Sequence, residues 1–492
     1  MSNGKDIKFI CSIRIFVFTH TLKNYFQEYS VNPLIQTCEE VIRFGEVWEK
    51  TDKCIKNLSI LEGKRVGLVS VPSPETLTLI CALIRLNTQI VLFSPFDPLP
   101  LIYKYIKEIQ PSVLFCEDDY ACKYTESPIP MVSYKKIEDI KQLEISNNLD
   151  KLQIGEECIF IIMTSGSSNS PKKVVLTLSN LLNNAYYSNR NLIFQQGNVW
   201  LLSLPLFHVS GLSVLFRSIE SGGSIYIPSE NIRWWEIDLP LEVTHISVVS
   251  TIMKRLLDKE NYFLGKRIQS ILLGGGPIPE GIVRKCYDMS LPLYTTYGLS
   301  EMSSQVTTTC PNDTLSHLLT SGKPLIPNTI KIGKDGDVFV RGPCRFQGYL
   351  KGNTLEKPFD AEGWFATQDI GKWTLDGYFQ ILGRKDNVFI CGGENIQPEE
   401  IENQIMCSGF VDKVVVVPMK DEEYGYVPIA FVDFSNDKKE GALKEYLKGQ
   451  IPAIKIPKYY LPFPKELEEK GIKISRKKLT EWVCNNIKQK GK

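Results

Sequence analysis

The chain has 492 residues, 43% of them hydrophobic, with 34 Gly and 28 Pro. This length supports a large core and more than one domain. Lys and Arg number 57 against 56 Asp and Glu, a net charge of +1, so no overall field favours nucleic acid or an anionic membrane surface. Any anion must be bound by a local site.

The thirteen cysteines are scattered, without C-x-x-C spacing or Cys/His clusters, and predict neither a zinc site nor a disulfide framework. This cysteine usage fits a reducing cytoplasm. The apolar stretch FICSIRIFV (9–17) is about half the length that a bilayer requires, and no small-residue cleavage site follows it. We expect an amphipathic strand or an unordered extension over about the first thirty residues, and no stable membrane insertion.

Short apolar runs alternate with longer amphipathic segments, a pattern typical of wound α/β layers. Buried strands are predicted at 65–71, 90–94, 158–163 and 270–273. After Asp335 the sequence changes to short strands and turns, followed by a helix at about 398–406, two strands and a final basic helix. We therefore predict an α/β protein with a large N-terminal domain of wound sheets and helices (1–383), a hinge (384–386) and a small, mobile α+β domain (387–492).

The stretch TSGSSNSPKK (164–173) follows the predicted strand at 158–163 and is rich in small and hydroxyl residues. Small residues there let backbone N–H groups and hydroxyls converge on one oxyanion, and Lys172 adds a positive charge. The register excludes a P-loop, because Pro171 replaces its second glycine and Lys173 replaces its Ser or Thr. On its own such a turn is more often a solvent loop.

Six further stretches follow in order: LSLPLFHVSG (202–211), LLGGGPIP (272–279), TTYGLSE (295–301), EGWFATQDIG (362–371), GRKDNVFICGGENIQPEEIE (383–402) and GIKISR (471–476). With the turn at 164–173, they resemble the motifs of the adenylate-forming superfamily of acyl-CoA synthetases, adenylation domains and luciferases. The resemblance runs from about residue 60 to the C terminus. Within this superfamily, WLLSLPLFHVSG, LLGGGPIP and ELEEKGIKISRKKLTEWV are most similar to the o-succinylbenzoate–CoA ligases of menaquinone biosynthesis.

The resemblance implies an AMP-forming acid–CoA ligase with ATP, Mg²⁺ and CoA as its cofactor and co-substrates. A carboxylate would attack the α-phosphate of ATP, giving acyl-AMP and pyrophosphate, and the CoA thiol would then displace AMP. The implied phosphate-binding residues are Thr164, Ser165, Gly166, Ser167, Ser168 and Lys172. Asn169 stands where relatives more often have Gly, but Asn tolerates left-handed dihedrals, so the loop shape can persist.

The other implied residues of the nucleotide and magnesium site come from four motifs. Glycines 274–276 would leave a shelf for the adenine, although an isolated glycine run is as often a plain turn. Glu301 resembles the magnesium ligand, and Asp369, supported by Arg384, resembles the carboxylate that binds the ribose hydroxyls. The full set is Gly274, Gly275, Gly276, Thr296, Tyr297, Gly298, Ser300, Glu301, Asp369 and Arg384.

Further roles are implied for residues near the hinge and the C terminus. Lys473 matches the cation that catalyses adenylation, although it lies in a charge run that could equally form a solvated face. Asp386 falls at the hinge position, where the small domain rotates between half-reactions. Gly392 and Gly393 match the loop that lines the CoA tunnel, and His208 matches a gate between the ATP and acyl pockets.

The acyl pocket is the part that motifs describe least. A substrate with an aromatic ring and a second carboxylate requires an apolar cleft and one cation, and Arg217 is our candidate for that cation. A surface arginine that closes a helix turn is the alternative.

Three other functions stay open: another aryl or fatty acid–CoA ligase, a stand-alone adenylation domain acting on a carrier protein, and a non-catalytic nucleotide-binding protein. We expect no carrier domain after Lys492, which would disfavour a multimodular synthetase. The presence of Glu301, Asp369, Arg384 and Lys473 disfavours a non-catalytic protein. The expected partners are a small carboxylic acid, ATP and CoA, without nucleic acid, and a homo-oligomer is left open.

Overall fold

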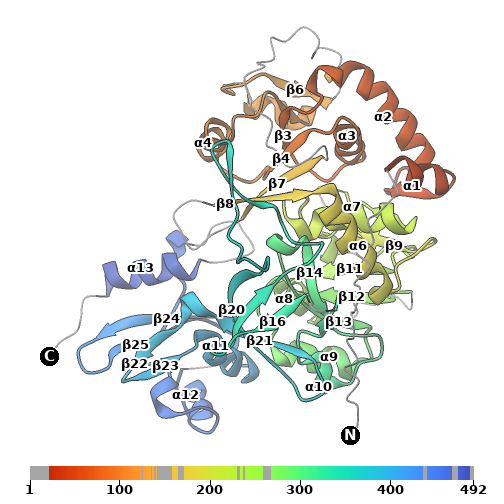
Figure 1. Cartoon of the computed structure of the whole chain (residues 1–492). Coiled ribbons are helices and arrows are strands. Elements are labelled where there is room, and N and C mark those ends of the chain that lie inside the picture. Colours follow the sequence, from red (N-terminus) through yellow and green to blue (C-terminus); the bar gives the residue numbers. More distant parts are fainter. Residues whose placement is uncertain are drawn as a thin grey trace, which may run out of the picture.

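The protein is represented by a computed structural model, which describes residues 22–487 except 125, 135, 138–139, 141–157, 165–170, 230–232, 237–238, 259–266, 328, 436–439 and 468–474. Two large sheets dominate the N-terminal part (Figure 1). The first has the order β19-β18-β8-β7-β4-β3-β5-β6, with a parallel core from β7 to β6. Its strands are β3 (Arg65–Val69), β4 (Gln89–Phe93), β5 (Leu114–Cys116), β6 (Met131–Ser133), β7 (Ile159–Thr164), β8 (Lys172–Thr177), β18 (Gly348–Lys351) and β19 (Thr354–Glu356).

The second sheet has the order β15-β14-β13-β12-β11-β9-β10-β1-β2 and is parallel from β13 to β1. Its strands are β1 (Pro33–Gln36), β2 (Val41–Arg43), β9 (Val199–Leu201), β10 (Ser224–Tyr226), β11 (His245–Val248), β12 (Ser270–Leu273), β13 (Leu293–Leu299), β14 (Ser304–Thr308) and β15 (Lys323–Pro324). The four buried strands predicted from sequence correspond to β3, β4, β7 and β12, with ends that differ by at most two residues.

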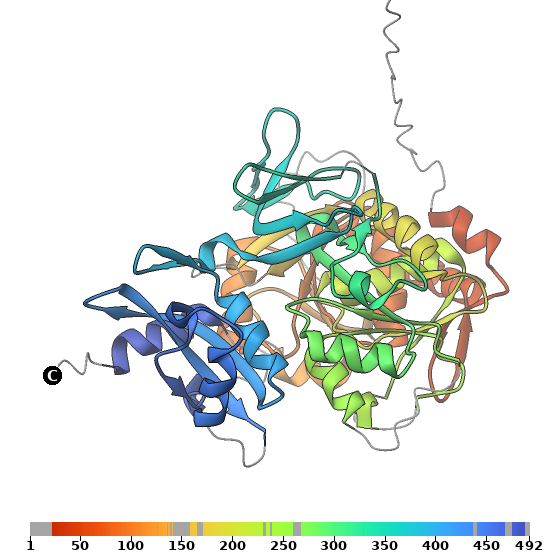
Figure 2. The same ribbon diagram turned by 90° about the horizontal axis from the view of Figure 1, so that it is seen from below.

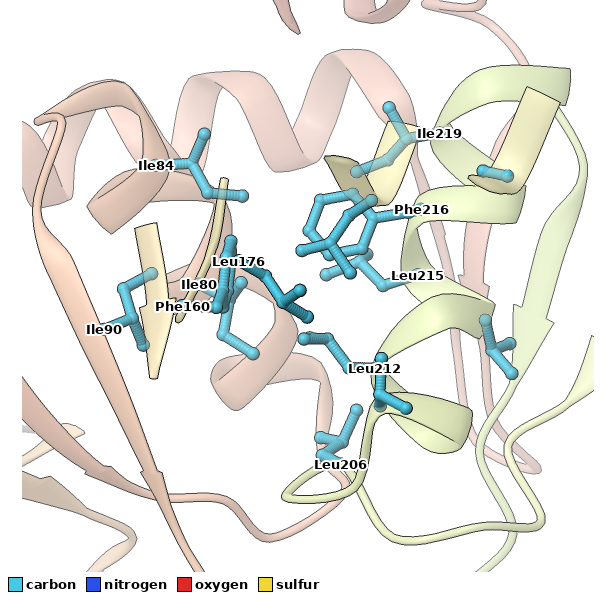
Figure 3. Packing of buried hydrophobic residues seen from close by; sticks show 14 of the residues in the cluster. Ile80, Ile84, Ile90, Phe160, Leu176, Leu206, Leu212, Leu215, Phe216 and Ile219 are labelled. Carbon is cyan, nitrogen blue, oxygen red and sulfur yellow. The ribbon is translucent and has the colours of Figure 1, made fainter. Parts of the chain in front are cut away.

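Helices fill the space between the two sheets and cover their outer faces. Alternate residues of β7 point to opposite sides, so Phe160 joins the core between the sheets and Ile161 joins the core under the outer helix. In Figure 3, Ile80, Ile84 and Phe160 face Phe216 of α7, with the rings of Phe160 and Phe216 5.5 Å apart. The inner helices are α2 (Phe44–Leu58), α3 (Pro74–Arg85), α6 (Leu178–Leu192) and α7 (Val209–Ser221); the outer ones are α4 (Leu99–Ile109), α8 (Ser250–Leu257), α9 (Glu280–Asp288) and α10 (Leu315–Leu318), and α5 (Asp118–Ala121) precedes β6.

The chain then forms two smaller sheets. One is antiparallel, with β16 (Ile330–Ile332), β17 (Asp337–Val340), β20 (Phe365–Trp373) and β21 (Phe379–Arg384). The C-terminal sheet contains β22 (Phe389–Cys391), β23 (Glu394–Ile396), β24 (Val411–Asp421), β25 (Gly425–Phe434) and β26 (Tyr460–Leu461). Helices α11 (Pro398–Cys407) and α12 (Glu440–Lys448) pack on one of its faces, and α13 (Arg476–Asn486) packs on the other.

The N-terminal expectation needs a correction. Helix α1 (Leu22–Glu28) buries Leu22, Tyr25 and Phe26 in the main core, and the ring of Phe26 lies 5.3 Å from that of Phe44. The prediction of an extension up to about residue 30 is therefore wrong from Leu22 onward, because aromatic side chains anchor this segment. The apolar stretch 9–17 lies outside the described residues. Among the described helices, none has both the length and the apolar character that crossing a membrane requires.

The C-terminal unit packs against the large N-terminal part (Figure 2). Helix α11 contacts α9 and β21. The ammonium group of Lys254 in α8 forms an ion pair with Asp412 in β24, and Asp412 also accepts a 2.6 Å hydrogen bond from Ser435. These contacts position the C-terminal sheet next to the end of β21.

A buried ion pair holds the start of α13 in the C-terminal unit. Both amino groups of Arg476 donate to Glu402, at 2.5 and 3.0 Å, and Arg476 also reaches Glu399 at 3.3 Å. Glu402 is 7% exposed, and burial raises its pKa, while the charge of Arg476 opposes that rise. A buried carboxylate of this kind depends on its cation.

We predict that Arg476→Ala lowers the free energy of unfolding by about 3 kcal/mol, because it leaves Glu402 buried and unpaired. Urea unfolding followed by circular dichroism would measure the change. Lys448→Ala, which breaks an exposed pair with Glu445 in the same unit, is the control and should cost less than about 1 kcal/mol. Equal effects of the two substitutions would contradict a structural role for the Arg476–Glu402 pair.

Candidate active site

The predicted phosphate loop connects two paired strands. Thr164 ends β7 and lies opposite Lys172, the first residue of β8, and its hydroxyl donates to the carbonyl oxygen of Lys172 at 3.4 Å. Ser165, Gly166, Ser167 and Ser168 lie outside the described residues. Lys172 is exposed, whereas Lys173 turns away and forms a 2.7 Å ion pair with Glu108. The hairpin therefore presents Lys172, rather than Lys173, as a cation for the loop.

Glycines 274–276 follow β12 and lie beside β13. A Cβ atom on Gly274 would lie 2.5 Å from the methyl group of Thr296, and Gly275 has a φ of +81°. Both positions therefore favour glycine. A Cβ atom on Gly276 would meet nothing within 4 Å. The run thus combines a tight backbone packed on β13 with one open edge, which suits a shelf for a flat ring.

Strand β13 carries the next three predicted residues. The hydroxyl of Thr296 donates to the carbonyl of Thr307 at 2.7 Å, so this side chain helps to hold β14 in place. The β13–β14 pairing is irregular between Tyr297 and Gly298. At Gly298 any Cβ would collide with the carbonyl oxygen of Ser304, so only glycine allows this approach. Tyr297 is paired with Thr307 and is the last residue before this irregularity.

Tyr297, Asp369 and Arg384 form one cluster. The hydroxyl of Tyr297 donates to Oδ2 of Asp369 at 2.6 Å, and Arg384 donates to Oδ1 at 3.3 Å. Asp369 and Arg384 are direct partners in the β20–β21 ladder. Arg384 also donates to Asp386 at 3.0 Å, which extends the cluster to the predicted hinge.

The cluster has unusual electrostatics. Asp369 is 8% exposed, and burial raises its pKa, although the hydrogen bond from Tyr297 and the charge of Arg384 oppose the rise. Burial and the neighbouring Asp369 raise the pKa of Tyr297 well above its ordinary value, so its hydroxyl stays protonated and donates. Gln368, next to Asp369, has a φ of 66°, which is uncommon for a residue with a side chain. Such features concentrate at functional sites.

Glu301 lies just after β13, in the short helical turn Ser300–Met302. Its Oε1 accepts a 2.7 Å hydrogen bond from the hydroxyl of Tyr349, while Oε2 has no hydrogen-bond donor in the described part of the chain. No group of three or more acidic, His or Cys side chains that could hold a metal occurs among the described residues. A single carboxylate oxygen nevertheless fits Mg²⁺, which commonly takes one or two carboxylates and completes its shell with phosphates and water. Glu301, with the hydroxyl of Ser300 nearby in sequence, fits this ion.

Arg217 is buried, so the alternative of a surface arginine is wrong. It lies in α7 and is 1% exposed. Its guanidinium donates to Ser188 at 2.9 Å and to Gln305 at 2.7 Å, and it lies 4.7 Å from the ring centroid of Trp200. Within the described residues, no carboxylate forms an ion pair with it. Burial lowers its pKa to about 9, which leaves it a cation at neutral pH.

The remaining predicted residues lie at the start of α7, in the hinge turn and in the C-terminal unit. His208 is exposed and precedes the first residue of α7, with its ring 4.5 Å from that of Phe207. Asp386 is in the turn Lys385–Asn387, and Gly392 and Gly393 join β22 to β23 with φ values of 56° and 89°. Lys473 lies outside the described residues.

The structure thus brings together Tyr297, Asp369 and Arg384, with Glu301 close enough for its charge to raise the pKa of Asp369 further. Sequence reasoning missed Tyr349 and the polar partners of Arg217. Tyr349 stands in the stretch RFQGYL (345–350), whose aromatic residues gave no chemical signal. Ser188 lies in α6 and Gln305 in β14, far apart in the sequence, so only the fold could identify them as partners of Arg217.

Comparison with known proteins supports a single family. Residues 40–350 match the model of the AMP-binding enzyme family, and residues 400–472 match the AMP-binding enzyme C-terminal domain. A 2-succinylbenzoate–CoA ligase from Listeria innocua is 30% identical over 90% of this chain and 94% of that protein. A 2-succinylbenzoate–CoA ligase from Haemophilus influenzae is 36% identical over 65% of this chain and 70% of that protein.

Solved structures of o-succinylbenzoate CoA synthetases have the same fold as this chain. The Bacillus subtilis o-succinylbenzoate CoA synthetase (MenE) in complex with the acyl-adenylate intermediate OSB-AMP is 25% identical, with a TM-score of 0.80 over 93% of this chain and 97% of that one. An E. coli MenE variant with bound OSB-AMS is 27% identical, with a TM-score of 0.77 over 94% of this chain and 97% of that one. B. subtilis MenE with ATP and magnesium is 25% identical, with a TM-score of 0.78 over 89% and 95% of the two chains. This chain belongs to the AMP-binding enzyme family.

Proposed function

We propose that this chain is an ATP-dependent acid–CoA ligase that converts 2-succinylbenzoate, ATP and CoA into 2-succinylbenzoyl-CoA, AMP and pyrophosphate through an acyl-adenylate. The observation that carries the proposal is the cluster of Tyr297, Asp369 and Arg384 beside Glu301 and the glycine shelf. The names of the relatives support the acid, and the complexes solved for MenE support the adenylate. The reaction would place the protein in the cytoplasm, as a step of menaquinone synthesis.

The cluster suits a nucleotide. The adenine would lie on the open edge at Gly276, next to the ring of Tyr297. The two oxygens of Asp369 would accept the ribose hydroxyls in place of Tyr297 and Arg384, which are their present donors. Thr164, Lys172 and the loop between them would bind the β- and γ-phosphates, and Ser300 the α-phosphate.

In the first half-reaction the acid carboxylate attacks the α-phosphorus and pyrophosphate leaves. Negative charge builds up on the transferred phosphoryl group, so fixed cations and donors provide most of the catalysis. Mg²⁺ held by Glu301 would neutralise phosphate charge when bound. Lys172 would hold the leaving pyrophosphate, and Lys473 would contact the reacting carboxylate and phosphate oxygens.

In the second half-reaction the CoA sulfur attacks the acyl carbon and AMP leaves. We propose that the C-terminal unit (387–492) rotates about residues 384–386 between the two steps, bringing Gly392 and Gly393 to the CoA channel. Arg384 and Asp386, which are paired here, would then lose or change their contact. His208, exposed at the start of α7, would separate the nucleotide and acyl pockets.

Arg217 is our candidate for binding the second carboxylate of the acid. Its partner Gln305 lines a small internal cavity of about 10 Å³ together with Asn184, whose Oδ1 has no donor among the described residues. This volume accommodates about one water molecule. The positive charge of Arg217 would therefore reach the acid through Gln305 and a bridging water.

We predict pyrophosphate release when the purified protein receives ATP, Mg²⁺ and 2-succinylbenzoate, and formation of the CoA thioester when CoA is added. A panel with benzoate, succinate, aryl acids, fatty acids and amino acids tests the substrate in the same coupled assay. Pyrophosphate release with a different acid, and not with 2-succinylbenzoate, would support the proposed reaction but show that the substrate is that other acid. Release with an amino acid but no CoA product would favour an adenylation domain, and no release with any acid would favour a non-catalytic protein.

We predict that Lys473→Ala slows adenylation by about 10²–10³-fold, the scale of one lost donor to the transition state. Thioester formation from supplied acyl-AMP and CoA should stay within about twofold of the wild type, because Lys473 is assigned to the first step alone. Rapid-quench assays of each half-reaction would measure both rates. An equal loss in the two half-reactions would contradict the proposed rotation.

We predict that Arg217→Met raises the KM for 2-succinylbenzoate by about tenfold, because it removes the positive charge that would act on the second carboxylate through Gln305, and leaves the KM for ATP unchanged. Arg65→Met is the matched control, since Arg65 is also 1% exposed and bonds to Gln89 in another sheet. Both variants should lose stability, but only the first should change the acid KM. An unchanged acid KM in Arg217→Met would remove Arg217 from the acyl site.

A further inference from the structure

Tyr349, in β18, contacts two residues of the proposed nucleotide site. It is 8% exposed, and its hydroxyl donates to Oε1 of Glu301 at 2.7 Å. The ammonium group of Lys172 lies 4.9 Å from the centroid of its ring, within the range of a cation–π interaction. One side chain therefore joins the proposed magnesium ligand to the proposed phosphate cation.

The backbone explains this geometry. Strand β18 pairs with β8, and Tyr349 lies opposite Val174. Lys172 is two residues from Val174 and so projects from the same face, at the diagonal position where a long side chain can reach a ring. The N–H of Phe346 donates to the carbonyl oxygen of Glu301 at 2.8 Å, which fixes the Glu301 turn against the segment that leads into β18.

The ring of Tyr349 has little freedom. It packs edge-on against Phe346 at 4.8 Å and against Phe365 at 6.4 Å. Burial, followed by the charge and the hydrogen bond of Glu301, raises the pKa of Tyr349 above its ordinary value. The hydroxyl therefore remains protonated and can only donate to the carboxylate.

We propose that Tyr349 is a positioning residue of the nucleotide site. Its hydroxyl fixes one oxygen of Glu301 and leaves the other to a divalent cation that is bound to the triphosphate, while its ring holds Lys172 beside the same phosphates. This inference rests on the proposed function. It predicts that the hydroxyl matters for the metal-bound nucleotide and that the ring matters for the nucleotide with or without metal.

The test is equilibrium binding of α,β-methylene-ATP, an analogue that cannot transfer its adenylyl group, measured by calorimetry. Tyr349→Phe should raise the Kd about tenfold in the presence of Mg²⁺, the value of a lost hydrogen bond to a charged group. In EDTA its Kd should equal that of the wild type. An unchanged Kd with Mg²⁺, or an equal loss with and without Mg²⁺, would overturn the role assigned to the hydroxyl.

The control is Tyr378→Phe. Tyr378 is 4% exposed, donates a 2.6 Å hydrogen bond to Asp313 and has Lys323 4.5 Å from its ring centroid, so it reproduces the arrangement of Tyr349 outside the site. It should bind the analogue as the wild type does, and a similar rise of its Kd would overturn the proposal by showing a general effect of losing a buried hydroxyl. Thermal unfolding of each variant would confirm that the chains are folded at the temperature of the assay.

A double-mutant comparison with Glu301→Gln separates a loss of the Tyr349–Glu301 contact from a general loss of stability. In Glu301→Gln, adding Tyr349→Phe should raise the Kd for the Mg²⁺ complex no further, because the two residues act through one contact. Additive effects would overturn the proposal. If the wild type itself bound no nucleotide, the proposed function would fail, and this inference with it; normal binding by both wild type and Tyr349→Phe would refute the inference alone.

Discussion

The buried carboxylate of Asp369 is the interaction on which the arrangement of the site depends. It takes Tyr297 from the nine-stranded sheet on one oxygen and Arg384 from the end of the four-stranded sheet on the other. Arg384 also donates to Asp386, in the turn that leads into the C-terminal unit. A carboxylate this deeply buried requires such donors, because an unpaired charge would cost several kcal/mol. The need to satisfy one charge therefore aligns three parts of the chain.

The contacts of Asp369 and Arg384 could couple nucleotide binding to the proposed rotation of the C-terminal unit. A ribose that took the oxygens of Asp369 would release Arg384, whose remaining partner Asp386 lies in the turn that joins the two units. On the far side of that turn, the Lys254–Asp412 ion pair links the C-terminal unit to α8. Each of these pairs is partly exposed, and contacts of this strength can break and reform with modest changes of free energy. The Arg476–Glu402 pair lies inside the C-terminal unit, so the proposed rotation would leave it intact.

The sequence predicted the buried parallel strands well. Short, mainly apolar runs such as 270–273 are typical of strands that are buried on both faces. Family motifs also assigned Tyr297, Asp369 and Arg384 to one nucleotide site, and the structure places their side chains in contact. The roles assigned to them stay predictions. Sequence reasoning failed at the N terminus, where α1 is held by scattered aromatic residues such as Phe26 that pack on Phe44 without a periodic signal. It also missed Tyr349, because its contacts with Glu301 and Lys172 arise from strand pairing between segments 175 residues apart in the chain. Tertiary pairing of this kind leaves no local pattern.

In the proposed reaction this chain activates a carboxylate by joining it to the α-phosphate of ATP. The most direct test of this step uses 2-succinylbenzoate labelled with ¹⁸O in its carboxylates, followed by mass spectrometry of the nucleotide after one turnover in the presence of CoA. Attack of the carboxylate on the α-phosphorus places one labelled oxygen in AMP, because the carboxyl oxygen stays on phosphorus when the thiol displaces the nucleotide. We expect AMP with a single ¹⁸O. Unlabelled AMP, or ADP with the label in inorganic phosphate, would contradict the account.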